Sequence, residues 1–137
     1  MKICSSIITY YNDKFLFLKR RDPNYQFVPP CGKIEPHEHP IEGAVRELLE
    51  ETCIKAIANK LLLVDVWTND NLVSLTYITN SETEDVILSE EHEAYVWIES
   101  HNLQSFQNQT DYDLSKWIIF RELHKKYDSY SDVVIYE

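Results

Sequence analysis

The segment GKIEPHEHPIEGAVRELLEE, from Gly32 to Glu51, concentrates glutamates on a chain whose formal net charge is already -10. From Pro40 to about Ile54, apolar residues recur at the spacing of one stripe along an α-helix. The spacing predicts a helix over residues 40–54. Pro40 suits its first turn, whereas His39 is a poor N-cap. The members of the stripe are Ile41, Ala44, Val45, Leu48 and Leu49.

Three glutamates of this helix, Glu47, Glu50 and Glu51, project from one face beside the apolar stripe at about 100° per residue. Like charges at these spacings destabilise a helix by a few tenths of a kcal/mol per pair. The grouping of three carboxylates on one face therefore requires an explanation. A solvated surface is one interpretation. A divalent metal site is the other, because Mg²⁺ prefers oxygen ligands and commonly bridges carboxylates and substrate phosphates. The metal would also give an acidic protein the positive charge that a polyphosphate requires.

Composition limits the classes of function. With 137 residues and 44% hydrophobic residues, the chain is expected to form a single domain over residues 1–137. The net charge of -10 argues against binding long nucleic acids, whose affinity depends on Lys and Arg. The three cysteines form no CxxC pair, which favours reduced thiols and a cytoplasmic location. No run of 18 apolar residues predicts a membrane span. The oligomeric state is left open.

Strand patterns flank the helix on both sides. The runs ICSSIITY and KFLFLKR predict a hairpin, and DPNYQFVPPCG predicts a loop. After the helix, LLLVDVW and NLVSLTYI predict two strands joined by TND, and EDVIL and YVWI predict shorter ones. Residues 111–127 predict a second amphipathic helix, and DVVIY a last strand or tail. This order favours an α/β or α+β fold with a mixed sheet covered by helices.

The stretch as a whole fits the pattern G-x5-E-x7-R-E-U-x-E-E-x-(C)-U, where U is a bulky aliphatic residue. It resembles the signature of the Nudix (MutT-like) hydrolases at every defined position except Cys53, where that family has glycine. The resemblance implies a three-layer α/β/α sandwich. It also implies Mg²⁺-dependent hydrolysis of a nucleoside diphosphate linked to another group, with Mn²⁺ as a possible substitute. The implied partner is a small nucleotide.

The resemblance also assigns roles to residues. Glu47, Glu50 and Glu51 would ligate the metal, and Glu38 would pair with Arg46 to brace them. The backbone carbonyl of Cys31 would be a further ligand. Because clustered carboxylates titrate together, the general base is not assigned to one of them, although Glu50 and Glu51 are favoured.

Two segments, FVPPCGKIEPHE and the later LSEEHEAYVWIE, are similar to segments of the asymmetrical diadenosine tetraphosphate hydrolases. Glu91 in the second segment is therefore a candidate metal ligand or base, with a charged loop as the plain alternative. Gly32, Lys33 and Arg20 are candidates for contact with substrate phosphates. Dinucleoside polyphosphates are the first expectation for the substrate, with nucleoside triphosphates and nucleotide sugars next. A non-catalytic nucleotide-binding domain is the alternative from another class.

Departures from the family pattern suggest a second kind of metal site. His37 and Cys53 stand where the family has glycine, and Cys31 stands where the subfamily often has lysine. Glycine tolerates a left-handed backbone that a side chain makes costly, so we expect slight re-routing there. Thiol and imidazole groups are also zinc ligands. A zinc site is thus an alternative, built from Cys31, His37, His39 and Cys53.

Overall fold

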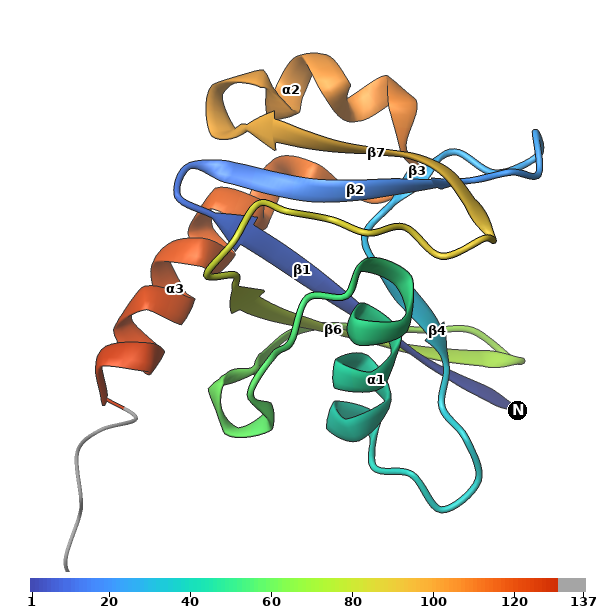
Figure 1. Cartoon of the computed structure of the whole chain (residues 1–137). Coiled ribbons are helices and arrows are strands. Elements are labelled where there is room, and N and C mark those ends of the chain that lie inside the picture. The colour runs from blue at the N-terminus through green and yellow to red at the C-terminus, as the bar shows by residue number, and fades with distance from the viewer. Residues whose placement is uncertain (131–137) are drawn as a thin grey trace, which may run out of the picture.

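A computed structural model describes residues 1–130 of the chain, and the predicted DVVIY segment lies outside them. Within these residues the chain forms seven strands, three α-helices and four short 3-10 helices, arranged as Figure 1 shows. The strands are β1 (Lys2–Tyr11), β2 (Lys14–Arg20), β3 (Phe27–Val28), β4 (Cys31–Lys33), β5 (Leu62–Thr68), β6 (Leu72–Asn80) and β7 (His92–Glu99). The helices are α1 (Pro40–Thr52), η1 (Ala58–Lys60), η2 (Ser100–Asn102), α2 (Leu103–Phe106), η3 (Gln107–Gln109), η4 (Leu114–Lys116) and α3 (Trp117–Tyr130).

One mixed sheet contains all seven strands, with β3-β2-β1-β6-β5 as its main order. Strand β1 is central and has three partners. It pairs antiparallel with β2 at its end and with β4 at its start, and it runs parallel to β6 from Lys2↔Leu72 to Tyr10↔Asn80. Strand β7 adds to β2 on the other side. Strands β2 and β4 share one edge of β1, so the sheet splits there. This split leaves the start of β4 next to α1.

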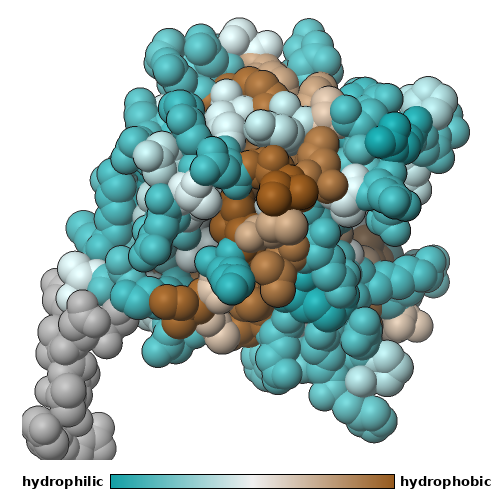
Figure 2. All heavy atoms as spheres, in the orientation of Figure 1, coloured by the Kyte–Doolittle hydropathy of each residue, from teal (hydrophilic) through white to brown (hydrophobic). Residues whose placement is uncertain are grey.

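Each face of the sheet has its own apolar cluster. Successive strand residues point to opposite faces, so Ile7 packs toward α1 while Ile8 packs toward α3. In α1, Ala44 and Leu48 complete the first cluster, and in α3 Trp117 is part of the second. Helices α1 and α3 thus cover opposite faces, which confirms the predicted three layers (Figure 1). Polar residues cover most of the face in Figure 2, with an apolar area near its centre.

Helix α1 begins and ends at residues that its sequence makes unusual. The Nδ1 atom of His39 accepts a hydrogen bond from the Ile41 amide at 3.1 Å, so this predicted poor N-cap does cap the helix. At the other end Cys53 takes the left-handed conformation, with φ 63°. His37 is also left-handed, with φ 67°. The expected re-routing is therefore wrong: both residues keep the backbone conformation that glycine favours.

Three predicted elements differ from the structure. The DPNYQFVPPCG loop contains the short strands β3 and β4. The EDVIL run forms no strand, because its amides bond to α1 instead of the sheet: Ile87 donates to the carbonyl of Thr52. The predicted helix over residues 111–127 begins only at η4 and continues as α3. No helix among the described residues is long and apolar enough to cross a membrane.

Candidate active site

A cleft of about 640 Å³ opens between the second half of α1, strand β4 and the segment before β7. Every candidate site residue from the sequence lines it except Glu38, which lies behind Arg46. Three elements that are distant in sequence therefore meet at this cleft. Its lining residues are Arg20, Cys31, Gly32, Lys33, Glu35, Arg46, Glu47, Glu50, Glu51, Ser89, Glu90 and Glu91.

Arg46 holds the acidic wall of the cleft in place. Its Nε and Nη2 atoms donate to the two carboxylate oxygens of Glu38 at 2.8 and 3.0 Å, which is the expected pair. Nη1 donates to Glu47 at 2.8 Å and to Glu50 at 3.3 Å. Nη2 also donates to the Lys33 carbonyl at 3.0 Å, which ties α1 to β4. The Arg46 hydrogen bonds lower the pKa of Glu38 to about 2, so this carboxylate stays ionised.

The three helix carboxylates lie at different depths. Glu50 is exposed, with 57% of its side chain accessible, whereas Glu51 is only 5% exposed. The three carboxylates line one cleft, as their helical spacing predicts, but β4 and the segment before β7 cover Glu51 and leave Glu50 exposed. Burial raises the pKa of Glu51 to about 8, and the neighbouring Glu47 adds to the effect. Burial also raises the pKa of Glu47, against the opposing hydrogen bond from Arg46. A bound cation would relieve both effects.

Strand β4 supplies the backbone side of the cleft. Pro30 and Ile34 bond to β1 through Pro30 O and Ile34 N, and their alternation with Gly32 turns the peptide groups of Cys31 away from β1. The Cys31 amide donates to Oε1 of Glu51 at 3.0 Å. By the same alternation its carbonyl faces the cleft side. Gly32 lies against Glu47, and an added Cβ would overlap that carboxylate.

The segment from Ile87 to Glu91 closes the cleft above the end of α1. The amide of Ser89 donates to the carbonyl of Glu51 at 3.2 Å. The amide of Ile87 donates to the carbonyl of Thr52, the next residue of the helix. These two bonds satisfy carbonyls at the helix end that have no partner inside the helix. The segment then turns into β7, which brings Glu91 and His92 beside α1.

The cationic candidates lie on the open side. Arg20 forms an ion pair with Glu91 at 3.7 Å and lies over the ring of Tyr25. Lys33 is exposed at the rim. Glu91 itself is exposed, and it contacts Arg20 instead of the helix carboxylates. The structure thus brings the predicted carboxylates of α1 and the candidate phosphate contacts to one cleft, with Glu38 behind Arg46 and Glu91 paired with Arg20.

The donor atoms of the cleft fit a hard divalent cation, since carboxylate oxygens and a backbone carbonyl are the groups that Mg²⁺ prefers. Among residues 1–130 no three His, Cys, Asp or Glu side chains are already gathered closely enough to form a metal centre. Arg46 accounts for part of this spacing, because it bridges Glu47 and Glu50. The carboxylates would therefore draw together around a cation.

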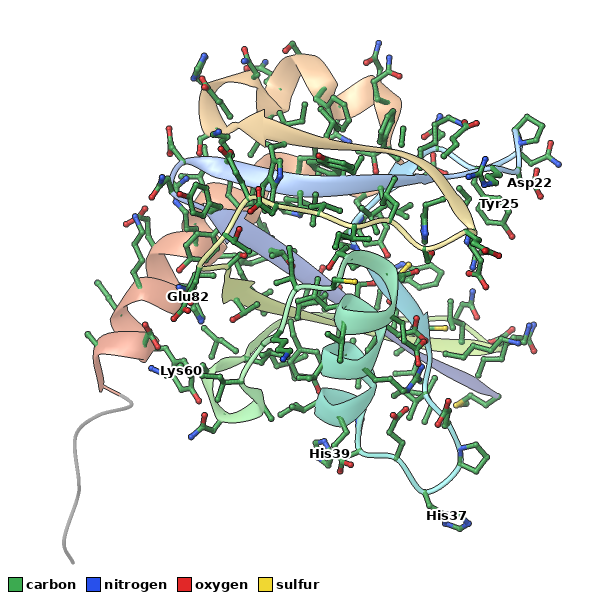
Figure 3. All side chains as sticks on the ribbon, in the orientation of Figure 1. Asp22, Tyr25, His37, His39, Lys60 and Glu82 are labelled. Atoms are coloured by element: carbon green, nitrogen blue, oxygen red, sulfur yellow. The ribbon has the colours of Figure 1, made fainter. Side chains whose placement is uncertain are left out.

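The alternative zinc site is not formed. His39 and Cys53 flank opposite ends of a 13-residue helix, and 13 residues of α-helix span roughly 20 Å. Figure 3 shows His37 and His39 beyond the N-terminal end of α1, with His37 at the tip of its loop. Desolvation raises the pKa of the Cys31 thiol to about 12 in the metal-free protein.

Ser89 and His92 were not predicted from the sequence as residues of the site, and neither were Glu35 and Glu90 of the cleft lining. His92 is 2% exposed, and its Nε2 lies 3.5 Å from Oε2 of Glu51. The hydroxyl of Ser89 lies 2.9 Å from the other ring nitrogen, Nδ1. The sequence feature that could have indicated Ser89 and His92 is their position on either side of Glu91, within the segment LSEEHEAYVWIE. The sequence did not indicate that His92, and not Glu91, would contact the buried carboxylate of Glu51.

Comparisons with known proteins agree with this geometry. The sequence model described as "NUDIX domain" matches residues 3–118. The asymmetrical bis(5'-nucleosyl)-tetraphosphatases of Mus musculus and Rattus norvegicus are each 30% identical over 99 residues. This match covers 62% of the chain and 63% of each relative, so the chain spans less than two thirds of the curated relatives it matches.

Solved structures share the fold at low identity. A NUDIX family hydrolase from Clostridium perfringens superposes with a TM-score of 0.68 at 16% identity, over 91% of this chain and 97% of the other. An Ap4A hydrolase from C. elegans, solved as a binary complex, gives 0.61 at 22% identity, over 93% and 97%. A bifunctional NMN adenylyltransferase/ADP ribose pyrophosphatase from Francisella tularensis gives 0.70 at 17% identity, over 90% and 41%. At such identities the likeness establishes the fold alone.

Proposed function

This chain belongs to the Nudix family, and from that premise we propose that it is a Mg²⁺-dependent hydrolase of nucleoside diphosphate derivatives. Dinucleoside polyphosphates such as diadenosine tetraphosphate are the first substrates to test. One observation carries the proposal. The three glutamates of α1 line a single cleft with the backbone of Cys31 and Gly32, and a side chain at Gly32 would fill the space against Glu47.

Each residue of the cleft has a task in this proposal. Glu47, Glu50, Glu51 and the Cys31 carbonyl would hold the cation, with Mn²⁺ as a possible substitute. When bound, the cation neutralises phosphate charge and lowers the pKa of a water molecule. Glu50 or Glu51 accepts the proton of the attacking water as its oxygen bonds to phosphorus and the phosphoanhydride P–O bond breaks. The departing phosphate leaves with the bonding electron pair.

The remaining polar residues orient the reactants. Arg46 keeps Glu47 and Glu50 in place and is itself fixed by Glu38. It therefore acts on the carboxylates and not on the substrate. Lys33 and Arg20 lie at the open rim, where their charges would contact the outer phosphates. Glu91 pairs with Arg20 at 3.7 Å, so phosphate binding to Arg20 would free Glu91 to approach the cation.

The choice of substrate rests on the sequence relatives, whose name specifies a bis(5'-nucleosyl)-tetraphosphatase. Nucleoside triphosphates are the second candidate, as the resemblance to MutT-like hydrolases in the sequence implies. A non-catalytic nucleotide-binding domain is disfavoured. It would not need three carboxylates beside one another, since each repels the charge of a phosphate.

A substrate panel with Mg²⁺ tests the proposal. The panel contains diadenosine tetraphosphate, dNTPs and nucleotide sugars, assayed at alkaline pH with and without chelator. We expect turnover of at least one member that requires Mg²⁺, and incorporation of ¹⁸O from labelled water into one phosphate product. Binding of nucleotide without turnover of any member would support the binding domain instead.

A further inference from the structure

The buried histidine beside the acidic cleft has no task in the mechanism above. His92 begins β7, is 2% exposed, and places Nε2 at 3.5 Å from Oε2 of Glu51. Glu51 is itself 5% exposed. Buried polar groups are normally paired, and each of these two has few other groups to pair with. Their contact is therefore one of those that hold the Glu51 side chain, beside the hydrogen bond from the Cys31 amide.

Ser89 contacts the ring nitrogen of His92 that faces away from the Glu51 carboxylate. Its Oγ lies 2.9 Å from Nδ1. When the hydroxyl donates to Nδ1, the ring proton of a neutral imidazole is on Nε2 and is directed at Glu51. Ser89 is fixed in turn, because its amide donates to the Glu51 carbonyl at 3.2 Å and the His92 amide donates to the Ser89 carbonyl at 3.2 Å. The three residues form a closed loop of contacts.

The two oxygens of Glu51 then have different partners. Oε1 accepts the Cys31 amide at 3.0 Å, and Oε2 faces His92 at 3.5 Å. One contact would leave the carboxylate plane free to turn, because the terminal torsion of glutamate has a broad minimum. Two contacts on different oxygens fix that plane. The contact to His92 is longer than an ordinary hydrogen bond, as is common for catalytic contacts before substrate binds.

We propose that His92, held in its Nε2–H form by Ser89, is a positioning residue that orients the Glu51 carboxylate toward the cleft. The proposal rests on the function proposed above, in which Glu51 holds the cation or accepts a proton. Groups that orient metal-binding side chains typically change metal affinity or activity by 10- to 100-fold when removed. His92 touches no substrate, so its removal should lower kcat much more than it changes KM.

Kinetics of matched variants provide the first test. His92→Leu removes the donor and keeps an apolar side chain of similar size, whereas His92→Gln keeps a donor near the position of Nε2. We expect kcat to fall about 10- to 100-fold in His92→Leu, with KM within about twofold, and to recover largely in His92→Gln. His101→Leu is the control, because His101 is exposed and pairs with Glu99 outside the cleft. Equal loss in the Leu and Gln variants would overturn the proposal.

Two measurements do not depend on turnover. ¹⁵N NMR of histidine-labelled protein should show His92 as the Nε2–H tautomer, and Ser89→Ala should shift it toward the other form. Calorimetric titration with Mn²⁺ alone should give about tenfold weaker binding in His92→Leu and no change in His101→Leu. A His92 proton on Nδ1, or unchanged Mn²⁺ affinity in a folded His92→Leu protein, would overturn the proposal even if the wild type cleaved no nucleotide. Failure of the substrate panel with these two results as expected would count against the function and not against the orientation of Glu51.

Discussion

Gly32 lies so close to Glu47 that even one methyl group between them would overlap the carboxylate. We therefore expect Gly32→Ala to displace Glu47 and to lower turnover by more than tenfold, with little loss of stability. Gly32 does not have a positive φ, so its backbone accepts alanine. Gly43→Ala is a useful comparison, since its Cβ would lie 3.0 Å from Oε1 of Glu38, a contact that a small shift relieves. A Gly32→Ala enzyme with wild-type kcat would contradict the placement of Glu47 in the site.

Glu50→Gln and Glu51→Gln keep the shape of the side chain and remove its charge. We expect each change to cut turnover by several orders of magnitude while the circular dichroism spectrum stays that of the wild type. Glu51→Gln retains an oxygen for the Cys31 amide, which supports an intact fold. Normal turnover in either variant would remove that residue from the mechanism.

The stability of the metal-free protein should depend on pH through Glu51. Its pKa is raised from 4.5 to about 8, so the folded chain keeps a proton that the unfolded chain releases. This contribution is complete below pH 4.5 and is lost as pH rises toward 8. We expect the free energy of unfolding to fall between pH 6.5 and 8, by at most about 1.4 kcal/mol per pH unit from this group.

Glu47 shifts in the same direction, because burial raises its pKa as well, so the comparison with Glu51→Gln is needed to isolate Glu51. Burial lowers the pKa of His92 below 6.5, which makes stability rise with pH only below that value, and Glu38 titrates near pH 2. Urea unfolding of wild type and Glu51→Gln at pH 6.5 and 8 measures the difference. The variant should show the flatter dependence, and saturating Mg²⁺ should flatten that of the wild type. Parallel curves would mean that Glu51 ionises normally in the folded protein.

Cys53 and His37 should be sites of easy stabilisation. Both have positive φ, a conformation that costs a residue with a side chain about 1 kcal/mol. We expect Cys53→Gly and His37→Gly each to raise the free energy of unfolding by about 0.5–1 kcal/mol, as measured by urea unfolding. Cys53→Ala keeps the strain and serves as the control. If Ala and Gly at position 53 were equally stable, the left-handed backbone there would carry no cost.

Arg46→Lys should break the link that Arg46 makes between the glutamates of α1 and the backbone of β4. Lysine is a point donor and cannot reproduce the fork that binds both oxygens of Glu38 while reaching Glu47. We expect at least a tenfold loss of kcat and a lower thermal midpoint. Retained kcat would show that Glu47 and Glu50 hold their positions without the guanidinium group of Arg46.

The sequence predicted the elements whose patterns are long and regular. The hairpin of β1 and β2 and the helix from Pro40 follow from periodicity and spacing, whereas the pairing of Glu38 with Arg46 followed from the resemblance to the Nudix signature. It did not predict β4, because three residues carry no period. Yet β4 decides that Glu51 is buried, so an angle on a helical wheel could not distinguish Glu51 from Glu50.

The segment 84–88 was predicted as a strand from its short apolar run, and the structure forms none there. The Ile87 amide instead bonds to the carbonyl of Thr52, and the following Ser89 amide bonds to that of Glu51, at the end of α1. A short apolar run does not distinguish pairing with a strand from pairing with helix carbonyls. For the same reason His92 could not be assigned to the site, since its partner lies 41 positions earlier in the chain and is reached only through this segment.

The parallel pairing of β1 with β6 joins residues about 70 positions apart, from Lys2↔Leu72 onward. Contacts of such sequence separation form late, because a long loop must close before any of them contributes. The cleft also needs the closure between Glu51 and Ser89. A metal ion would therefore meet a chain that has already folded: it would adjust a finished protein and not start its assembly.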